Sequence, residues 1–226
     1  MDSNQRTRLI LQAAARLVAH YGFDKTTMED IAREAGVSKG ALYLCWSSKD
    51  SLFDALLAHE MKRMLVDLKG RIAQDPRGGT IAGLYRHTLL ALQSIPLMCA
   101  LYTRDSRILG DYVRRQDVER YTRRLLLSAE SIRQMQATGQ LRPDLRPETM
   151  AYLFSLLSLG FMSIGAVIPA STAPPLEEVV DGMARLVESG LAVPGSAGGF
   201  SNQAAAAMID LMLEQYEQET GASHER

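Results

Sequence analysis

The chain of 226 residues has little of what marks several common classes of protein. Its two cysteines, Cys45 and Cys99, lie far apart and form no Cys-x-x-Cys pair, so the sequence predicts neither a disulfide framework nor a zinc knuckle. The first residues, MDSNQRTR, are polar and lack the apolar stretch of a secretory signal, so we expect a cytoplasmic protein. Positive charge is not in excess, since 25 Lys and Arg stand against 26 Asp and Glu. Any contact with nucleic acid must therefore come from a local surface and not from bulk charge.

The signatures of common catalytic sites are also missing. The four histidines have no metal-binding or catalytic spacing, and His59-Glu60 lacks the second histidine of the H-E-x-x-H motif. The sequence contains no phosphate-binding loop, no G-x-S-x-G elbow and no dinucleotide fingerprint. We therefore expect that the protein is not an enzyme and that it uses no metal ion or cofactor.

One apolar segment is long enough to raise the question of a membrane. No charged residue occurs between Glu148 and Glu177, and the stretch from Met150 to Ile168 is just long enough to span a bilayer. Serines and glycines interrupt the stretch, prolines end it, and no cluster of Lys or Arg follows it. Small residues along an apolar helix also suit close packing between the helices of a soluble oligomer. We favour this second interpretation and expect no membrane association.

Helical patterns run along nearly the whole chain, and no segment has a convincing strand pattern. Apolar residues recur three or four positions apart from Leu9 to Tyr21, and Gly22 ends the run. Further helices are predicted over residues 48–75, 80–94, 96–109, 111–138, 147–168, 176–192 and about 203–219, with a linker rich in Pro and Gly over 194–199. The predicted fold class is therefore all-α.

The most informative stretch is TMEDIAREAGVSKGALYLCWSSKDSL, which begins at Thr27. Thr27 and Asp30 have the spacing of a capping box at the start of a helix. Gly36 can take the left-handed conformation of a tight turn, and Ser38 can cap a second helix that extends to about Trp46. Two short capped helices joined by such a turn form a helix-turn-helix, whose second helix enters the major groove of DNA.

Helical angles predict which side of the second helix faces outward. If Leu42 points at the core, Ser38 and Trp46 lie close to the same direction at 100° per residue, whereas Gly40 and Leu44 point away from it. Glycine at the outward position lets the helix backbone approach a groove closely. The outward side is therefore the predicted DNA-facing side.

Particular side chains on and beside that side suit DNA contacts. Ala41 also allows close approach, Tyr43 can donate its hydroxyl to a phosphate, and Lys39 places a charge at the helix start. Leu44 suits the methyl group of thymine, and Lys49 lies at the first turn of the next helix, where free amides favour a second phosphate. The alternative is that these are ordinary surface residues, because two short helices and a glycine are a common pattern.

Residues Arg6 to Leu57 resemble the N-terminal domain of the TetR family. The similarity lies in the run ILQAAARLVAHYGFDKTTMEDIAREAGVSKGALY and in the sequence Ser-Lys-Asp that begins at Ser48. It implies a three-helix DNA-binding domain over 1–52, a helical ligand-binding and dimerisation domain over 53–193, and a linker with an extra helix over 194–226. It also implies that DNA contacts are made by Thr27, Ser38, Lys39, Tyr43 and Lys49. Leu44, Cys45 and Trp46 depart from the residues common in the family, so the bases that are read do not follow from the resemblance.

The resemblance implies a regulatory mechanism as well. A homodimer would form through Pro147–Ile168 and Leu176–Ala192, and its two recognition helices would read a palindromic operator. A small apolar or aromatic effector would release the repressor from this operator. Candidate ligand-binding residues in the middle helices are Met61, Met64, Leu68, Tyr85, Met98, Tyr102, Tyr121 and Phe161. The alternative function is a helical dimeric interaction module without sequence-specific DNA binding.

Overall fold

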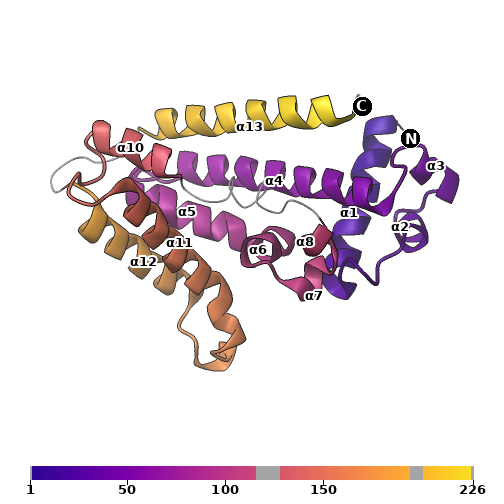
Figure 1. Ribbon diagram of the computed structural model, residues 1–226, viewed down its shortest axis with the longest axis horizontal. Helices are drawn as coiled ribbons and strands as arrows, with labels where there is room; N and C mark the ends of the chain where they lie inside the picture. Colours follow the sequence, from indigo (N-terminus) through magenta and orange to yellow (C-terminus); the bar gives the residue numbers. More distant parts are fainter. Residues whose placement is uncertain (1, 116–127, 194–200, 225–226) are drawn as a thin grey trace. The chain divides into compact units, whose positions relative to one another are not determined.

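The computed structural model describes residues 2–115, 128–193 and 201–224, and Figure 1 shows their arrangement into helices. These residues contain no strand, only one isolated bridge between Leu141 and Ala192, which agrees with the predicted all-α fold. The α-helices are α1 (Ser3–Tyr21), α2 (Met28–Glu34), α3 (Lys39–Tyr43), α4 (Lys49–Gln74), α5 (Ile81–Gln93), α6 (Pro96–Thr103), α7 (Ser106–Leu109), α8 (Tyr112–Arg115), α10 (Ala129–Ala137), α11 (Pro147–Ser163), α12 (Leu176–Leu191) and α13 (Asn202–His224).

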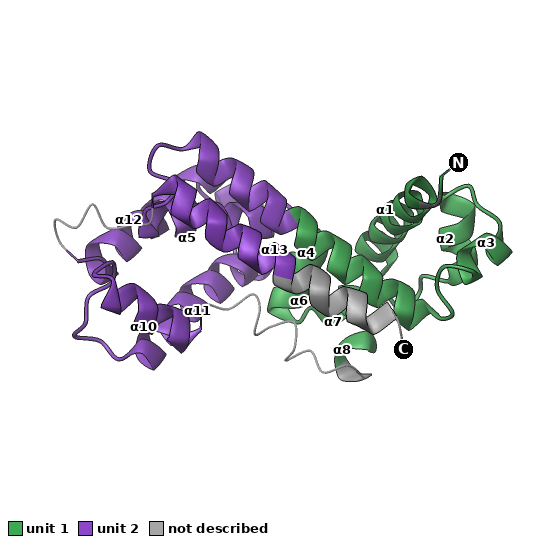
Figure 2. Cartoon of the chain, turned by 90° about the horizontal axis from the view of Figure 1, so that it is seen from above, with its two compact units in different colours: residues 1–63, 95–121 green, residues 64–94, 122–226 purple. Residues whose placement is uncertain are grey.

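The chain forms two compact units, which are coloured separately in Figure 2. Unit 1 comprises residues 1–63 and 95–121, and unit 2 comprises residues 64–94 and 122–226. The bounds of these units therefore differ from those of the predicted domains, which divide the sequence after residue 52. Unit 1 adds the first part of α4 and the later helices α6 to α8 to the N-terminal helices.

Several helices end or begin at other positions than the sequence predicted. The predicted helix over 96–109 is divided, because Arg104 adopts a left-handed conformation with φ of 53° and Asp105 caps the start of α7. The predicted helix over 111–138 is interrupted at Ser128, whose hydroxyl caps α10 by accepting a hydrogen bond from the amide of Ser131 at 3.1 Å, and residues 116–127 of this prediction lie outside the described residues. A side chain that caps a backbone amide favours a new helix start, even where the apolar spacing continues. Likewise, α11 ends at Ser163 and is followed by the 3₁₀ helix η1 (Ile164–Ala166).

Unit 2 is built around an apolar core between α5, α10, α11 and α12. The core includes Tyr85 and Phe154, whose ring centroids are 5.5 Å apart. Along the second part of α4 lies α13, as Figure 1 shows. The side chain of Asn202 holds the start of α13 there, since it donates to the carbonyls of Ile72 and Asp75 at 3.0 and 2.7 Å and accepts from the amide of Gly79 at 2.7 Å. The extra C-terminal helix is therefore integrated into unit 2.

Candidate nucleic-acid interface

The first helix of the predicted motif begins at a cap made by its own sequence. The hydroxyl oxygen of Thr27 accepts a hydrogen bond from the amide of Asp30 at 3.1 Å, and the hydroxyl donates to the Asp30 carboxylate at 2.6 Å. That donated hydrogen bond is the main reason why the pKa of Asp30 lies below its ordinary value, with Arg33 as a further partner. The carboxylate thus stabilises the capping hydroxyl itself. Thr27 is exposed beside this cap.

The turn between α2 and α3 has the predicted glycine geometry. Gly36 has φ of 67°, and no atom lies within 4 Å of the position that a Cβ would take. The amide of Val37 donates to the carbonyl of Ala32 at 3.0 Å, which closes the turn. The hydroxyl oxygen of Ser38 then accepts from the amide of Ala41 at 3.1 Å and starts α3. The two helices and their turn are therefore specified by contacts between residues three to five positions apart.

The outward side of α3 is as the helical angles predicted. Leu42 has none of its surface exposed, and Trp46 is buried as well, so both face the core of unit 1. On the other side, Leu44 is 87% exposed and Tyr43 is 42% exposed. Gly40 is exposed, and an added Cβ there would meet nothing within 4 Å. This surface is open and consists of a glycine without a side chain, a phenol and an apolar group, and half-buried Ala41 flanks it.

Cys45 is exposed at the end of this helix. Its angle of about 60° from the core direction on a regular helix predicts a half-buried thiol. The difference arises because α3 ends at Tyr43, before the predicted end near Trp46, so Cys45 follows the last helical turn.

Lys39 stands at the start of α3 with its charge partly compensated. Its ammonium forms an exposed ion pair with the carboxylate of Glu29 on α2. The hydrogen bond with Glu29 raises the pKa of Lys39, and the same bond lowers the pKa of Glu29. Exposed ion pairs of this kind contribute little free energy, so a phosphate can replace the carboxylate at low cost.

Lys49, which the sequence predicts to contact a phosphate, directs its ammonium toward the connection between α1 and α2. Its ammonium donates to the carbonyls of Phe23 and Thr26 at 2.9 and 3.1 Å and lies 4.1 Å from the centroid of the Phe23 ring. The start of α4 is capped by Ser48, whose hydroxyl oxygen accepts from the amide of Ser51 at 3.0 Å.

The predicted ligand-binding residues fall into both units. Buried in unit 1 are Met61, Met98 and Tyr102, and those of unit 2 are Met64, Leu68 and Tyr85, which are buried, and Phe161, which is half-buried. Tyr121 lies outside the described residues.

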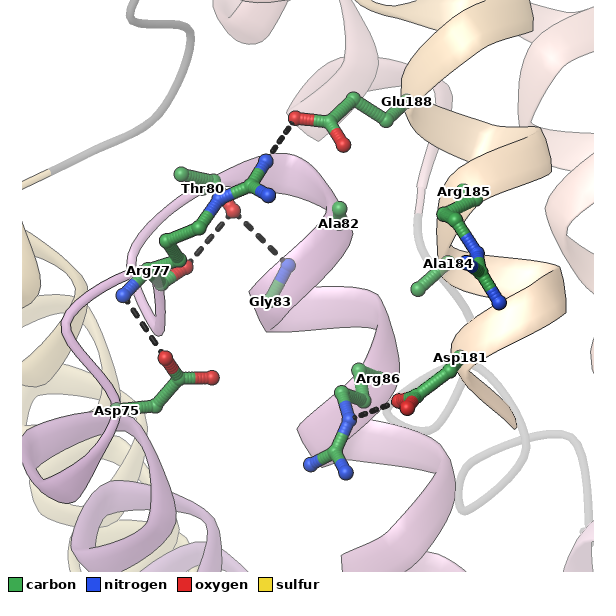
Figure 3. A pocket seen from close by; sticks show the side chains of 10 residues that line it. All are labelled: Asp75, Arg77, Thr80, Ala82, Gly83, Arg86, Asp181, Ala184, Arg185 and Glu188. Atoms are coloured by element: carbon green, nitrogen blue, oxygen red, sulfur yellow. Dashed lines mark hydrogen bonds and ion pairs between the residues drawn. The ribbon is translucent and has the colours of Figure 1, made fainter. Parts of the chain in front are cut away.

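A cleft of about 230 Å³ between α5 and α12 has none of these seven described residues in its lining (Figure 3). Two ion pairs cross it, one between Arg77 and Glu188 and one between Arg86 and Asp181, the second at 2.5 Å. The cleft is therefore charged, whereas the predicted binding residues are mostly apolar.

Comparisons with known proteins show a family similarity in the N-terminal helices. Residues 10–56 match the model of bacterial regulatory proteins of the tetR family. The HTH-type transcriptional regulator YvdT of Bacillus subtilis is 38% identical over 66 residues, which are 29% of this chain and 34% of YvdT. The chain thus spans about a third of that relative. The HTH-type transcriptional repressor AcnR of Corynebacterium jeikeium is 27% identical over 206 residues, which cover 86% of this chain and 96% of AcnR.

A solved structure extends the similarity to the fold of most of the chain. The crystal structure of AibR in complex with isovaleryl coenzyme A and operator DNA superposes with a TM-score of 0.55 at 21% identity, covering 80% of this chain and 97% of AibR. These relatives are regulators, which agrees with the prediction that the chain is not an enzyme. Over residues 10–56 the chain is therefore similar to the tetR family of bacterial regulatory proteins.

Proposed function

We propose that the protein is a DNA-binding transcriptional repressor of the cytoplasm that reads a palindromic operator as a homodimer and is released by a small-molecule effector. The observation that carries this proposal is the outward side of α3, where Leu44 is almost fully exposed beside Gly40 and Tyr43 on a helix that Ser38 caps. Leu44 follows the last residue of α3 as its C-cap and buries little of its side chain, and such an exposed apolar group suits a thymine methyl group. Thr27, Lys39 and Ala41 complete the proposed DNA contacts.

The outer face of α11 and α12 supports the proposed homodimer. Tyr152, Leu156 and Leu159 share one side of α11, whereas Met150 and Phe154 on the other side are buried in unit 2. The large apolar side chains exposed on and between these helices are Tyr152, Leu153, Leu156, Leu159, Ile164, Val167, Ile168, Leu176 and Leu186. Exposed large apolar side chains gathered on neighbouring helices favour an interaction site. Since a two-fold interface uses the same patch on both subunits, a second copy would cover all of these side chains at once.

The same helix also meets the length and composition criteria for a membrane span. Residues Pro147–Ala166 are apolar enough to cross a bilayer, which by itself is weak evidence. Against a span, Phe154 and Met150 pack into the core with α5, α10 and α12, and Glu148 near the start of α11 forms an ion pair with Arg133 at 3.1 Å. A helix with one packed and one exposed apolar face suits a helix bundle between two subunits.

The effector is proposed to be small and apolar or aromatic, and acyl coenzyme A thioesters, which carry an apolar acyl group on a polar carrier, are the first class to test. AibR holds isovaleryl coenzyme A together with operator DNA. In this chain the predicted ligand-binding residues on α4 to α6 are buried, and methionine adapts readily to apolar ligands. Binding of such an effector would shift the dimer toward a state in which the two recognition helices no longer match the operator.

The proposal is tested by the binding of the purified protein to labelled DNA from the region upstream of its own gene, with selection from random DNA in parallel. We expect saturable, palindrome-dependent binding that weakens with salt, followed by release with an acyl coenzyme A from a panel of chain lengths. Binding no tighter than to random DNA in both experiments would favour the alternative of a helical interaction module. If the dimer binds its operator and none of the compounds releases it, the proposed effector class is wrong.

A further inference from the structure

The ammonium of Lys49 connects the first turn of α4 to the connection between α1 and α2. It donates to two carbonyls of that connection, those of Phe23 and Thr26, which are 26 and 23 positions earlier in the chain. The charge also lies over the Phe23 ring at 4.1 Å, a distance typical of a cation–π contact. This side chain is half-buried and directed inward.

The connection needs such a donor because three of its residues are buried. Gly22, Phe23 and Thr26 are buried, and the hydroxyl of Thr26 donates to the carbonyl of Gly22 at 2.8 Å. A buried carbonyl without a partner costs about 1–3 kcal/mol, and a charged donor makes a stronger hydrogen bond than a neutral one. Lys49 satisfies the carbonyl of Thr26, the residue directly before the cap of α2.

The same connection is held from a second side by the later helices of unit 1. The amide of Phe23 donates to the carbonyl of Ile108 at 2.7 Å, and its ring lies 4.7 Å from Phe53 on α4 and 5.5 Å from Tyr112 on α8. Gly22 has φ of 82°, and a Cβ there would lie 2.5 Å from the carbonyl oxygen of Arg107, so the approach is close. Lys49 completes this junction from the side of α4.

We propose that Lys49 is a positioning residue, which sets where α4 begins relative to α2 and α3, and that its ammonium is not a phosphate ligand in the DNA complex. The inference rests on the proposed function, because positioning matters here only for a protein that reads DNA. Thr26 is followed by Thr27, the cap of α2, so a shift of the Lys49 side chain displaces the start of the helix-turn-helix. The phosphate beside α4 is then bound by the backbone amides at its N-terminus.

The test is a salt titration of operator binding by Lys49→Met, which keeps the aliphatic stem and removes the charge, with Lys39→Met as the matched control on α3. The binding constant K falls as salt rises, and removal of one phosphate ligand from each subunit of a dimer makes the slope of log K against log salt concentration less steep by about 1.8, twice the ~0.9 per phosphate. We expect Lys49→Met to bind about tenfold more weakly at every salt concentration with an unchanged slope. Lys39→Met is expected to make the slope less steep.

A measurement without DNA separates this proposal from the proposed function. Amide hydrogen exchange of the free protein should become faster at residues 23–27 in Lys49→Met and stay unchanged there in Lys39→Met. A reduced slope for Lys49→Met, or a lower melting temperature with unchanged operator affinity, would overturn the positioning role. Wild-type protein that binds no selected DNA would instead refute the proposed function, and the exchange data would still decide whether Lys49 holds the junction.

Discussion

Leu156→Asp is expected to break the proposed homodimer. Leu156 is 49% exposed in the middle of the outer face of α11. Complete burial of a leucine side chain contributes about 1.5–3 kcal/mol, so covering the exposed half contributes about 1 kcal/mol. A two-fold axis repeats each contact, and the pair of leucines therefore contributes about 2 kcal/mol.

The substitution adds a penalty to this loss. Two carboxylates at the centre of an apolar interface must be desolvated or protonated, which costs at least a further ~1 kcal/mol. The sum of about 3 kcal/mol or more corresponds to a dimer dissociation constant roughly a hundredfold higher or more, since about 1.4 kcal/mol is a factor of ten.

Sedimentation equilibrium over a range of protein concentrations measures this constant directly. Leu211→Asp is the matched control, because Leu211 is 55% exposed but lies on α13, outside the proposed interface. Circular dichroism should show the same helix content for both variants. If Leu156→Asp and wild type associate equally, or if the control dissociates to the same extent, the assignment of the interface is wrong.

Three further outcomes are expected. Tyr43→Phe keeps the ring and removes the hydroxyl, so operator binding measured by fluorescence anisotropy should weaken about tenfold, as for the loss of a hydrogen bond to a charged group; an unchanged affinity would exclude that contact. Asn202→Ala removes three hydrogen bonds at the end of α4 and should lower the free energy of unfolding in urea by about 2–3 kcal/mol; a loss below about 0.5 kcal/mol would contradict a structural role for the start of α13. The pKa of Asp75 is held below its ordinary value, first because its carboxylate accepts from the amide of Arg77 and second because the His87 ring lies beside it. The stability that this depressed pKa contributes is present above pH ~4 and is lost as the pH falls below that value. In Asp75→Asn the free energy of unfolding should therefore fall less steeply with pH in this range than in the wild type. An equal loss of stability in both proteins would refute the role of Asp75.

The helix-turn-helix could be predicted from the sequence because its determinants are local. Thr27 and Ser38 each accept from an amide three residues ahead, and Gly36 adopts its left-handed conformation with no neighbouring atom in the way. Apolar spacing likewise identified Leu42 as the buried side of α3 and Leu44 as the exposed side. Interactions between close neighbours are encoded in the order of residues, so they need no knowledge of the fold.

The role of Lys49 could not be predicted in the same way. Its position at a helix start suggested a phosphate contact, whereas its partners are carbonyls more than twenty residues away. The division into units is also not apparent from the sequence, because residues 95–121 return to join the N-terminal helices.

The sequence by itself therefore determined the all-α class, the paired short helices and the outward side of α3, which depend on side chains within one or two helical turns. Only the tertiary structure decided which donor satisfies the carbonyls of Phe23 and Thr26, where the helix that includes Asn202 docks, and which face of α11 is left exposed. The physical reason is that a buried polar group must find a partner, and an apolar face must be covered, by whatever segment the fold brings near.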